Sequence, residues 1–378
     1  MIYLDHAATT KIRDEVFDAM LPYLKEEYGN PSSVYALGRS AHKALDRARE
    51  QVRAALGARA AREIFFTGCG TESDNWAIRG AALENVKKGR HIITTKVEHH
   101  AVLDSCKYLE KLGWEVTYLD VDSSGQVSAG DVAGAIRPDT VLISVMFANN
   151  EVGTINPIRE IGELAREKGI LFHVDAVQAV GHVPIDVENM GIDMLSLSGH
   201  KFYAPKGVGA LYIRNGVTIE KFLQGGAQER RRRAGTENVA SIVGMGEAIT
   251  LAMQEMPEET RRLGKLSAHM LSRLQKEIPG TRLNGHAEDR LPGNVNISLP
   301  SVRSEAALFH LDLEGIACSS GSACTSGSVE ASHVLLAMGL SEREARSALR
   351  FTMGRETTRE ELDRTVDVLK KIAEQKEK

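Results

Sequence analysis

The chain is organised around the stretch Asp193-Met194-Leu195-Ser196-Leu197-Ser198-Gly199-His200-Lys201. Residues 194–197 form a mostly apolar run, and a short apolar run followed by turn residues predicts a buried strand. The strand ends in a Ser-Gly-His turn that delivers one lysine, Lys201. This placement favours chemistry at the end of the strand.

Lys201 has two interpretations. A lysine just past a strand is usually an exposed surface residue, because lysines are rarely buried. Alternatively it is a Schiff-base lysine, whose pKa falls on desolvation so that the neutral amine attacks an aldehyde. The neighbours favour the second interpretation, because Ser198 and His200 offer side chains for a phosphate and a second apolar strand, residues 170–174, leads into Asp175.

A lysine and an aspartate at the ends of two strands match the needs of pyridoxal 5′-phosphate (PLP), an amine for the aldehyde and an anion for the pyridinium nitrogen. Three segments closely resemble those of the cysteine desulfurases of the NifS and IscS type. They are Ser-Leu-Ser-Gly-His-Lys (196–201), His-Val-Asp-Ala-Val-Gln (173–178) and Ser-Ser-Gly-Ser-Ala-Cys-Thr-Ser-Gly (319–327). The similarity runs from residues 3–10 to residues 350–355 and so covers nearly the whole chain.

Composition alone says less. With 378 residues the chain is long for one core, so two domains are expected. The net charge of -4 gives no general reason to expect a nucleic-acid or membrane surface, and only Arg230 to Arg233 form a basic run. No stretch approaches a membrane span, the first residues lack the pattern of a signal peptide, and four scattered cysteines are too few for a disulfide framework. We therefore expect a cytoplasmic protein.

Short apolar strands alternate with amphipathic helical stretches, which predicts an α/β architecture with a largely parallel sheet. The expected strands are 63–66, 91–95, 115–119, 141–147, 170–174, 194–197 and 209–213, with helices at 71–87, 102–112 and 158–168 between them. The pattern changes after about Pro257 to a long charged helix, strands near 294–299 and 316–318, and helices at 304–312, 332–338 and 358–375.

The resemblance implies the PLP-dependent transferase fold of the aspartate aminotransferase type, a large domain with a mostly parallel seven-stranded sheet plus a smaller α/β domain. We expect residues 16–257 to form the large, PLP-binding domain and residues 258–378 the small domain, which carries the cysteine loop. The resemblance also implies that residues 1–15 pack with the small domain.

The turn from Thr67 to Ser73 places glycines after a strand and hydroxyls at a helix start, where backbone N–H groups bind phosphate. Read alone, such a turn is as often plain turn chemistry. The resemblance assigns the phosphate to the Gly70-Thr71 pair, Ser198 and His200. It also implies that Thr236 reaches the phosphate of a neighbouring subunit, and hence a homodimer with shared sites.

His99 and His100 follow the strand at 91–95. A histidine here is more often structural, and no Cys or acidic residue completes a zinc-like spacing, so no metal is expected. The resemblance aligns His99 with the imidazole that stacks on the PLP ring and moves protons. It also implies that Asp175 keeps the pyridine nitrogen protonated and that Gln178 hydrogen-bonds the ring hydroxyl.

Asn149 ends the strand at 141–147 and is either a turn residue or, as the resemblance implies, a residue beside cofactor and substrate. Arg350 lies in an apolar stretch, where an unpaired cation is costly. A substrate carboxylate gives it a bidentate partner, and the resemblance places such an arginine here.

Cys324 lies in the polar run 319–328, which shows neither helix nor strand periodicity and is predicted to be a mobile loop. An exposed cysteine in such a loop can act as a nucleophile, whereas Cys318 ends an apolar run and is better interpreted as a packing residue. The resemblance thus implies a cysteine desulfurase that takes sulfur from L-cysteine, leaves L-alanine and stores the sulfur on Cys324 as a persulfide.

Alternatives are a selenocysteine lyase, another class V PLP enzyme such as a transaminase, and a non-catalytic scaffold. The resemblance implies that the persulfide passes to an acceptor protein, either an iron–sulfur scaffold or a tRNA thiolation enzyme, without direct contact with nucleic acid. The chain stops soon after its last helix, where the IscS type carries an additional tail, so the choice of acceptor stays open.

Overall fold

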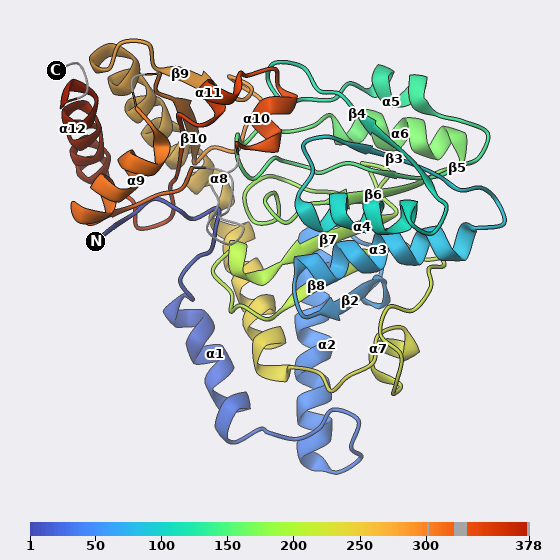
Figure 1. Cartoon of the computed structure of the whole chain (residues 1–378). Coiled ribbons are helices and arrows are strands. Elements are labelled where there is room, and N and C mark those ends of the chain that lie inside the picture. Colours follow the sequence, from blue (N-terminus) through green and yellow to red (C-terminus); the bar gives the residue numbers. More distant parts are fainter. Residues whose placement is uncertain (301, 321–330, 376–378) are drawn as a thin grey trace.

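The computed structural model describes residues 1–300, 302–320 and 331–375. A seven-stranded sheet forms the centre of the larger part of the molecule (Figure 1). In spatial order its strands are β2 (Ile64–Thr67), β8 (Gly209–Ile213), β7 (Met194–Ser198), β6 (Leu171–Asp175), β5 (Thr140–Ser144), β3 (His91–Thr95) and β4 (Glu115–Leu119). Only β8 runs antiparallel to its neighbours in this sheet, so the expected mostly parallel seven-stranded sheet is confirmed.

Helices cover both faces of this sheet. One face packs on α3 (Gly70–Asn85) and α4 (His100–Glu110), whose apolar side chains form a core with Phe65, Ile92 and Leu142. The other face packs on α1, α2, α5, α6 and the first part of α8. These helices span Asp14–Lys25 (α1), Ala36–Leu56 (α2), Ala129–Ala135 (α5), Ile158–Lys168 (α6) and Val239–Glu277 (α8). Because both faces are covered, strands such as β5 and β7 are buried along their whole length.

The C-terminal part has its own core. An antiparallel sheet of β12 (Ala348–Thr352), β10 (Asn294–Ser298) and β9 (Arg282–Asn284) packs with α9 (Ser304–Leu313) and α12 (Arg359–Gln375). Two further helices, α10 (His333–Ala337) and α11 (Glu342–Ala345), lie between this part and the large sheet (Figure 1). The N-terminal strand β1 (Ile2–Tyr3) pairs in parallel with β11 (Ile316–Ala317), and Ile2 and Leu4 are buried in this second core.

Helix α8 joins the two cores, because it passes through Pro257 rather than beginning after it. Ile242 and Met245 pack into the first core, whereas Leu263 and Met270 pack into the second. A domain division at Pro257 therefore cuts a continuous helix and stays a prediction. The sequence pattern missed this continuity because the interior proline reads as a helix boundary.

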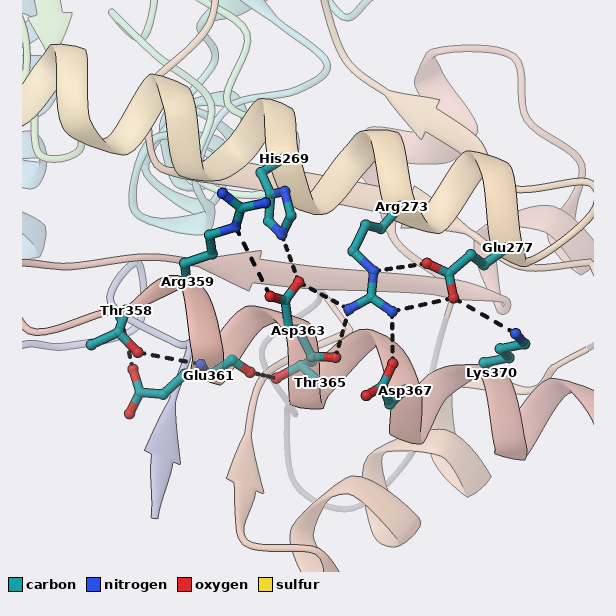
Figure 2. Close-up of polar contacts among 10 residues, drawn as sticks. All are labelled: His269, Arg273, Glu277, Thr358, Arg359, Glu361, Asp363, Thr365, Asp367 and Lys370. Carbon is teal, nitrogen blue, oxygen red and sulfur yellow. Dashed lines mark hydrogen bonds and ion pairs between the residues drawn. The ribbon is translucent and has the colours of Figure 1, made fainter.

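An ion-pair network fastens the second half of α8 to α12 (Figure 2). Arg273 contacts Glu277, Asp363 and Asp367 at 2.7, 2.9 and 2.6 Å, and His269 Nε2 lies 2.6 Å from Asp363. The network complements the apolar contacts of Leu362, Val366 and Leu369 on the buried side of α12. It fixes α12 to the second half of the long helix α8.

Candidate active site

A cavity of about 540 Å³ lies where β6 and β7 end. The two strands are parallel neighbours, with Asp175 opposite Ser196, so their carboxyl ends meet at one edge of the sheet. Lys201 follows at the end of the short helix η2 (Gly199–Lys201). The cavity is lined by these predicted site residues: Gly70, Thr71, His99, Asp175, Gln178, Ser198, His200, Lys201 and Arg350.

The amine of Lys201 lies in a desolvated position. Its Nζ donates hydrogen bonds to the carbonyl oxygens of Ala7 and Ala8, at 2.6 and 2.8 Å. Burial, followed by the nearby Arg350 cation, lowers the pKa of Lys201 to about 8, although Asp5 and Asp175 act in the opposite direction. A substantial fraction of such an amine is neutral near physiological pH, so it can act as a nucleophile and as a base.

Asp175 lies on the floor of the cavity beside a second buried carboxyl. Its Oδ1 accepts a hydrogen bond from the Val177 N–H at 2.9 Å, and burial raises its pKa. Asp74 is also buried there, and burial together with the Asp175 charge raises the pKa of Asp74 well above its usual range. Two neighbouring carboxylates cannot both ionise cheaply. We therefore expect Asp74 to carry a proton and Asp175 to carry the charge.

His173 is a buried neighbour of Asp74. His173 lies 3.6 Å from Asp74 and hydrogen-bonds the hydroxyls of Ser144 and Ser196 at 2.9 and 3.0 Å. Burial lowers the pKa of His173 to about 3, so the ring is neutral. Asp175 consequently receives no opposing positive charge from His173 and remains the anion that is available to a ligand.

The start of α3 forms one wall of the cavity. Backbone N–H groups are unsatisfied at a helix N-terminus, and a Cβ on Gly70 would lie 2.6 Å from Val177 Cγ2, so glycine allows this close approach. Ser198 Oγ is buried and has no hydrogen-bond partner among the described residues. Burial lowers the pKa of His200 to about 4, and its Nδ1 lies 3.1 Å from Thr9 Oγ1. A neutral, donor-rich corner of this kind suits a phosphate group.

His99 is held by the helix that it caps. Its Nδ1 accepts a hydrogen bond from the Ala101 N–H at 3.1 Å, which assigns the ring proton to Nε2. The side chain is accessible from the cavity, yet the surrounding protein lowers its pKa by desolvation. His100 instead packs against His333, with ring centroids 4.8 Å apart and the ring planes tilted by 49°. His99 is therefore the member of the pair that faces the cavity.

Asn149 and Gln178 differ in their placement. Gln178 lines the cavity, and its Nε2 donates to the Ala7 carbonyl at 2.9 Å. Asn149 is buried outside the cavity lining; its amide donates to the Val97 carbonyl and accepts from the N–H groups of Glu151 and Val152. This geometry favours the turn-residue interpretation of Asn149, and a direct contact with cofactor or substrate stays a prediction.

Arg350 is buried in β12 and already has an anionic partner. Its Nη2 lies 2.8 Å from Asp5 Oδ1, and its Nη1 donates to the Asn150 carbonyl at 2.8 Å. Its Nε is buried without a hydrogen-bond partner among the described residues. The apolar sequence around Arg350 contains no partner for the cation, and the structure supplies Asp5. A pairing between residues at opposite ends of the chain leaves no local signal, so sequence reasoning missed it.

The cysteines around the cavity are not equivalent. Cys324 falls outside the described residues. Cys318 lines the cavity, but burial raises its pKa to about 12, so it remains a thiol. Such a thiol is a poor nucleophile, which agrees with the packing role inferred from the sequence. Cys69, which belongs to the turn at residues 67–73, also lines the cavity.

Thr236 lies outside the cavity of its own chain. It is exposed and follows the short helix α7 (Gln228–Arg231). Two ion pairs hold this segment: Glu229 binds Arg49 in a buried bidentate contact at 2.8 Å, and Arg233 binds Glu72 at 2.7 Å. The segment is thus rigidly presented at the surface.

A family model for the class-V aminotransferases matches residues 2–365. The chain belongs to the class-V aminotransferase family. A protein named cysteine desulfurase IscS from Dictyoglomus turgidum is 53% identical over 99% of this chain and 94% of that relative. A protein of the same name from Methanosarcina thermophila is 54% identical over 99% of this chain and 92% of its own length.

Solved structures agree with the family assignment. A NifS-like protein is similar with a TM-score of 0.93 and 39% identity, over 99% of both chains. A structure of SspA in complex with cysteine gives a TM-score of 0.82 and 37% identity, over 93% of this chain and 99% of that one. Class-V aminotransferases are PLP-dependent enzymes, so the cavity must be tested for its fit to this cofactor.

The residues present fit PLP. The cavity brings together an amine at Lys201, an anion at Asp175 and the unpartnered hydroxyl of Ser198 beside a helix start. These groups match the aldehyde, the pyridinium nitrogen and the phosphate of the cofactor. Within residues 1–300, 302–320 and 331–375, no group of three His, Cys, Asp or Glu side chains is arranged to hold a metal ion.

Proposed function

We propose that this class-V enzyme is a cysteine desulfurase, which moves the sulfur of L-cysteine to Cys324 and releases L-alanine. One observation carries the proposal. The amine of Lys201, the carboxylate of Asp175 and the guanidinium of Arg350 share one cavity, and its lining includes Cys318, Ser319 and Ser320. Cys324 comes four residues after Ser320 in the sequence, and four residues of chain span at most about 14 Å.

PLP would be held by Lys201, His200, Ser198 and the Gly70-Thr71 pair, with Asp175 and Gln178 at the ring. When bound, PLP withdraws electrons from Cα of the substrate and so makes its proton removable. Lys201 is the base for this proton, because its lowered pKa leaves a large neutral fraction. His99 also lines the cavity and presents Nε2–H as a proton donor.

Arg350 binds the substrate carboxylate in this proposal, and Cys324 attacks the substrate sulfur as a thiolate. The S–S bond of a persulfide forms, the C–S bond breaks with its electron pair left on carbon, and that carbon takes a proton to become the methyl group. Cα takes back the proton that Lys201 removed, which completes L-alanine. A thiolate is required because the thiol form is a weak nucleophile. Cys318, whose pKa is raised to about 12, is the wrong thiol for this step.

The test compares Cys324→Ser with Cys318→Ser in PLP-loaded protein. Cys324→Ser should still bind L-cysteine, seen as a change in cofactor absorbance, but should release almost no L-alanine and gain no extra sulfur by mass analysis. Cys318→Ser should keep most of both. Wild-type release of L-alanine by Cys324→Ser, or sulfur mapped to Cys318, would show that the assigned nucleophile is wrong.

A homodimer is part of the proposal. Thr236 is exposed and does not line the cavity of its own chain, as expected for a residue that serves a neighbouring site. Large apolar side chains are also exposed on α1 and on the segment after it, namely Phe17, Leu24, Tyr28, Val34 and Tyr35. Exposed apolar side chains of this kind suit burial against a second copy. Light scattering should give twice the chain mass, and Thr236→Ala should weaken PLP retention without dissociating the dimer.

The persulfide on Cys324 passes to a sulfur-acceptor protein in the cytoplasm, either an iron–sulfur scaffold or a tRNA thiolation enzyme. The IscS-named relatives support an acceptor of this general kind. No helix of the described ranges is long and apolar enough to cross a membrane. Incubating persulfidated protein with a panel of candidate acceptors, and following labelled sulfur, identifies the recipient.

A further inference from the structure

Asp5 joins the N-terminal segment to the proposed carboxylate site. Its backbone is fixed, because its carbonyl oxygen accepts hydrogen bonds from the Tyr3 hydroxyl at 3.1 Å and from the Ala8 N–H at 2.9 Å. Its side chain lines the cavity and reaches Arg350 Nη2 at 2.8 Å. The carboxylate of Asp5 therefore binds the same guanidinium, that of Arg350, to which a substrate carboxylate would bind.

The two partners of this ion pair differ in their access to solvent. The Arg350 side chain is 6% exposed, whereas that of Asp5 is 20% exposed. A buried guanidinium is costly without an anion, but a partly exposed carboxylate can be rehydrated when it is displaced. Arg350 thus needs an anion at all times, and Asp5 can exchange with a second one.

The free donor of Arg350 shows where that second anion meets it. The guanidinium is held at Nη1 by the Asn150 carbonyl and at Nη2 by Asp5, while Nε is buried without a partner in the described ranges. An incoming carboxylate that binds along the Nε edge must share or take Nη2 from Asp5, because bidentate pairing uses two neighbouring nitrogens.

We propose that Asp5 is a positioning residue that competes with the substrate carboxylate for Arg350, and so lowers the affinity for amino-acid substrate and product. The inference rests on the proposed role of Arg350. Its benefit is release of L-alanine, because an enzyme that binds substrate and product through the same carboxylate contact must also let the product leave.

Asp5 also acts on Lys201 through its charge. The Asp5 carboxylate raises the pKa of Lys201 and the Arg350 cation lowers it. Neutralising Asp5 should therefore lower the pH at which the Lys201 amine titrates. A residue with a purely structural role would leave this titration unchanged, so the pH profile is an independent measurement.

The experiment uses PLP-loaded Asp5→Asn, which keeps an acceptor oxygen but loses the charge. L-alanine is titrated by cofactor absorbance, with Asp14→Asn as the control, because Asp14 is an exposed aspartate of the same segment. Asp5→Asn should bind L-alanine about three- to tenfold more tightly, since a partly exposed ion pair no longer competes. The pH midpoint of the Lys201-linked absorbance should also fall. Asp14→Asn should match wild type in both measurements.

The variant Arg350→Gln distinguishes an error in the proposed competition by Asp5 from an error in the proposed role of Arg350. If it weakens L-alanine binding while Asp5→Asn binds no more tightly than wild type, competition by Asp5 is wrong and the proposed function stands. If Arg350→Gln leaves L-alanine binding unchanged, the carboxylate role of Arg350 is wrong as well. Should Asp5→Asn fail to fold, Asp5→Ser provides the same loss of charge, and an affinity at or below that of wild type overturns the inference.

Discussion

The segment that presents Thr236 is held in strained backbone by one buried ion pair. Glu229, Arg230 and Arg231 all have positive φ, at 42°, 55° and 65°. Left-handed backbone costs about 1–2 kcal/mol for each residue that is not glycine, or roughly 3–6 kcal/mol for the three. Against this, the Glu229 carboxylate binds Arg49 through both oxygens and accepts the Phe66 N–H at 3.0 Å.

Glu229→Gln should release this segment locally. Breaking a buried pair by removing one charge costs about 3–5 kcal/mol, which is close to the strain that the pair offsets. At 1.4 kcal/mol for each tenfold change, the open fraction of residues 228–236 should rise by about 100- to 4,000-fold. Global unfolding should change less, because Arg230 and Arg233 keep other contacts, to the Ile64 carbonyl and to Glu72.

Limited trypsin digestion with mass mapping measures this opening, because Arg230 to Arg233 offer cleavage sites as soon as the segment unfolds. Glu220→Gln is the matched control, since the Glu220 side chain is exposed. The double variant Arg49→Leu with Glu229→Leu should be cleaved more slowly than Glu229→Gln, because it leaves no buried charge unpaired. Cleavage of Glu229→Gln at the wild-type rate would refute the balance between strain and ion pair.

Three further predictions concern the cofactor and the small domain. Incorporation of PLP into apo-protein should accelerate as pH rises through about 8. Burial lowers the pKa of Lys201 to that value, and the amine is mostly neutral at a pH above it. A flat rate profile between pH 7 and 9 would contradict this. Gly70→Ala should weaken PLP binding about tenfold, because its Cβ would meet Val177 at 2.6 Å, whereas Gly134→Ala, with open space around it, should not. The pKa of Asp363 is lowered, first by its hydrogen bond to His269. The ionised carboxylate therefore stabilises the folded protein at a pH above the unfolded-state pKa of about 3.9, and this contribution is lost as the pH falls through the folded-state pKa. Asp363→Asn should thus destabilise the protein by about 1 kcal/mol at pH 7 and should lose this difference from wild type in acid, followed by denaturant unfolding at both pH values.

The sequence by itself determined the parts of the site that depend on neighbouring residues. Residues 194–201 read as a strand, a turn and a lysine because hydrophobic run length and turn chemistry are local properties. The same holds for the helix start at Gly70, where the turn glycines and hydroxyls are adjacent in the chain. Asp175 at the end of β6 follows from the same reasoning, and the family resemblance joined these pieces before any contact was known.

Only the tertiary structure decided which distant groups meet. Asp5 and Arg350 are 345 residues apart, and their pairing depends on the N-terminal strand lying beside β11 next to the small-domain sheet. Asp74 reads as one polar residue in a helix, and its burial beside Asp175 depends on which face of α3 packs on the sheet. The sequence also left the role of Asn149 undecided, because its amide could hydrogen-bond either within the turn or to a ligand in the cavity. Such choices are set by side-chain direction and long-range packing, which sequence periodicity does not encode.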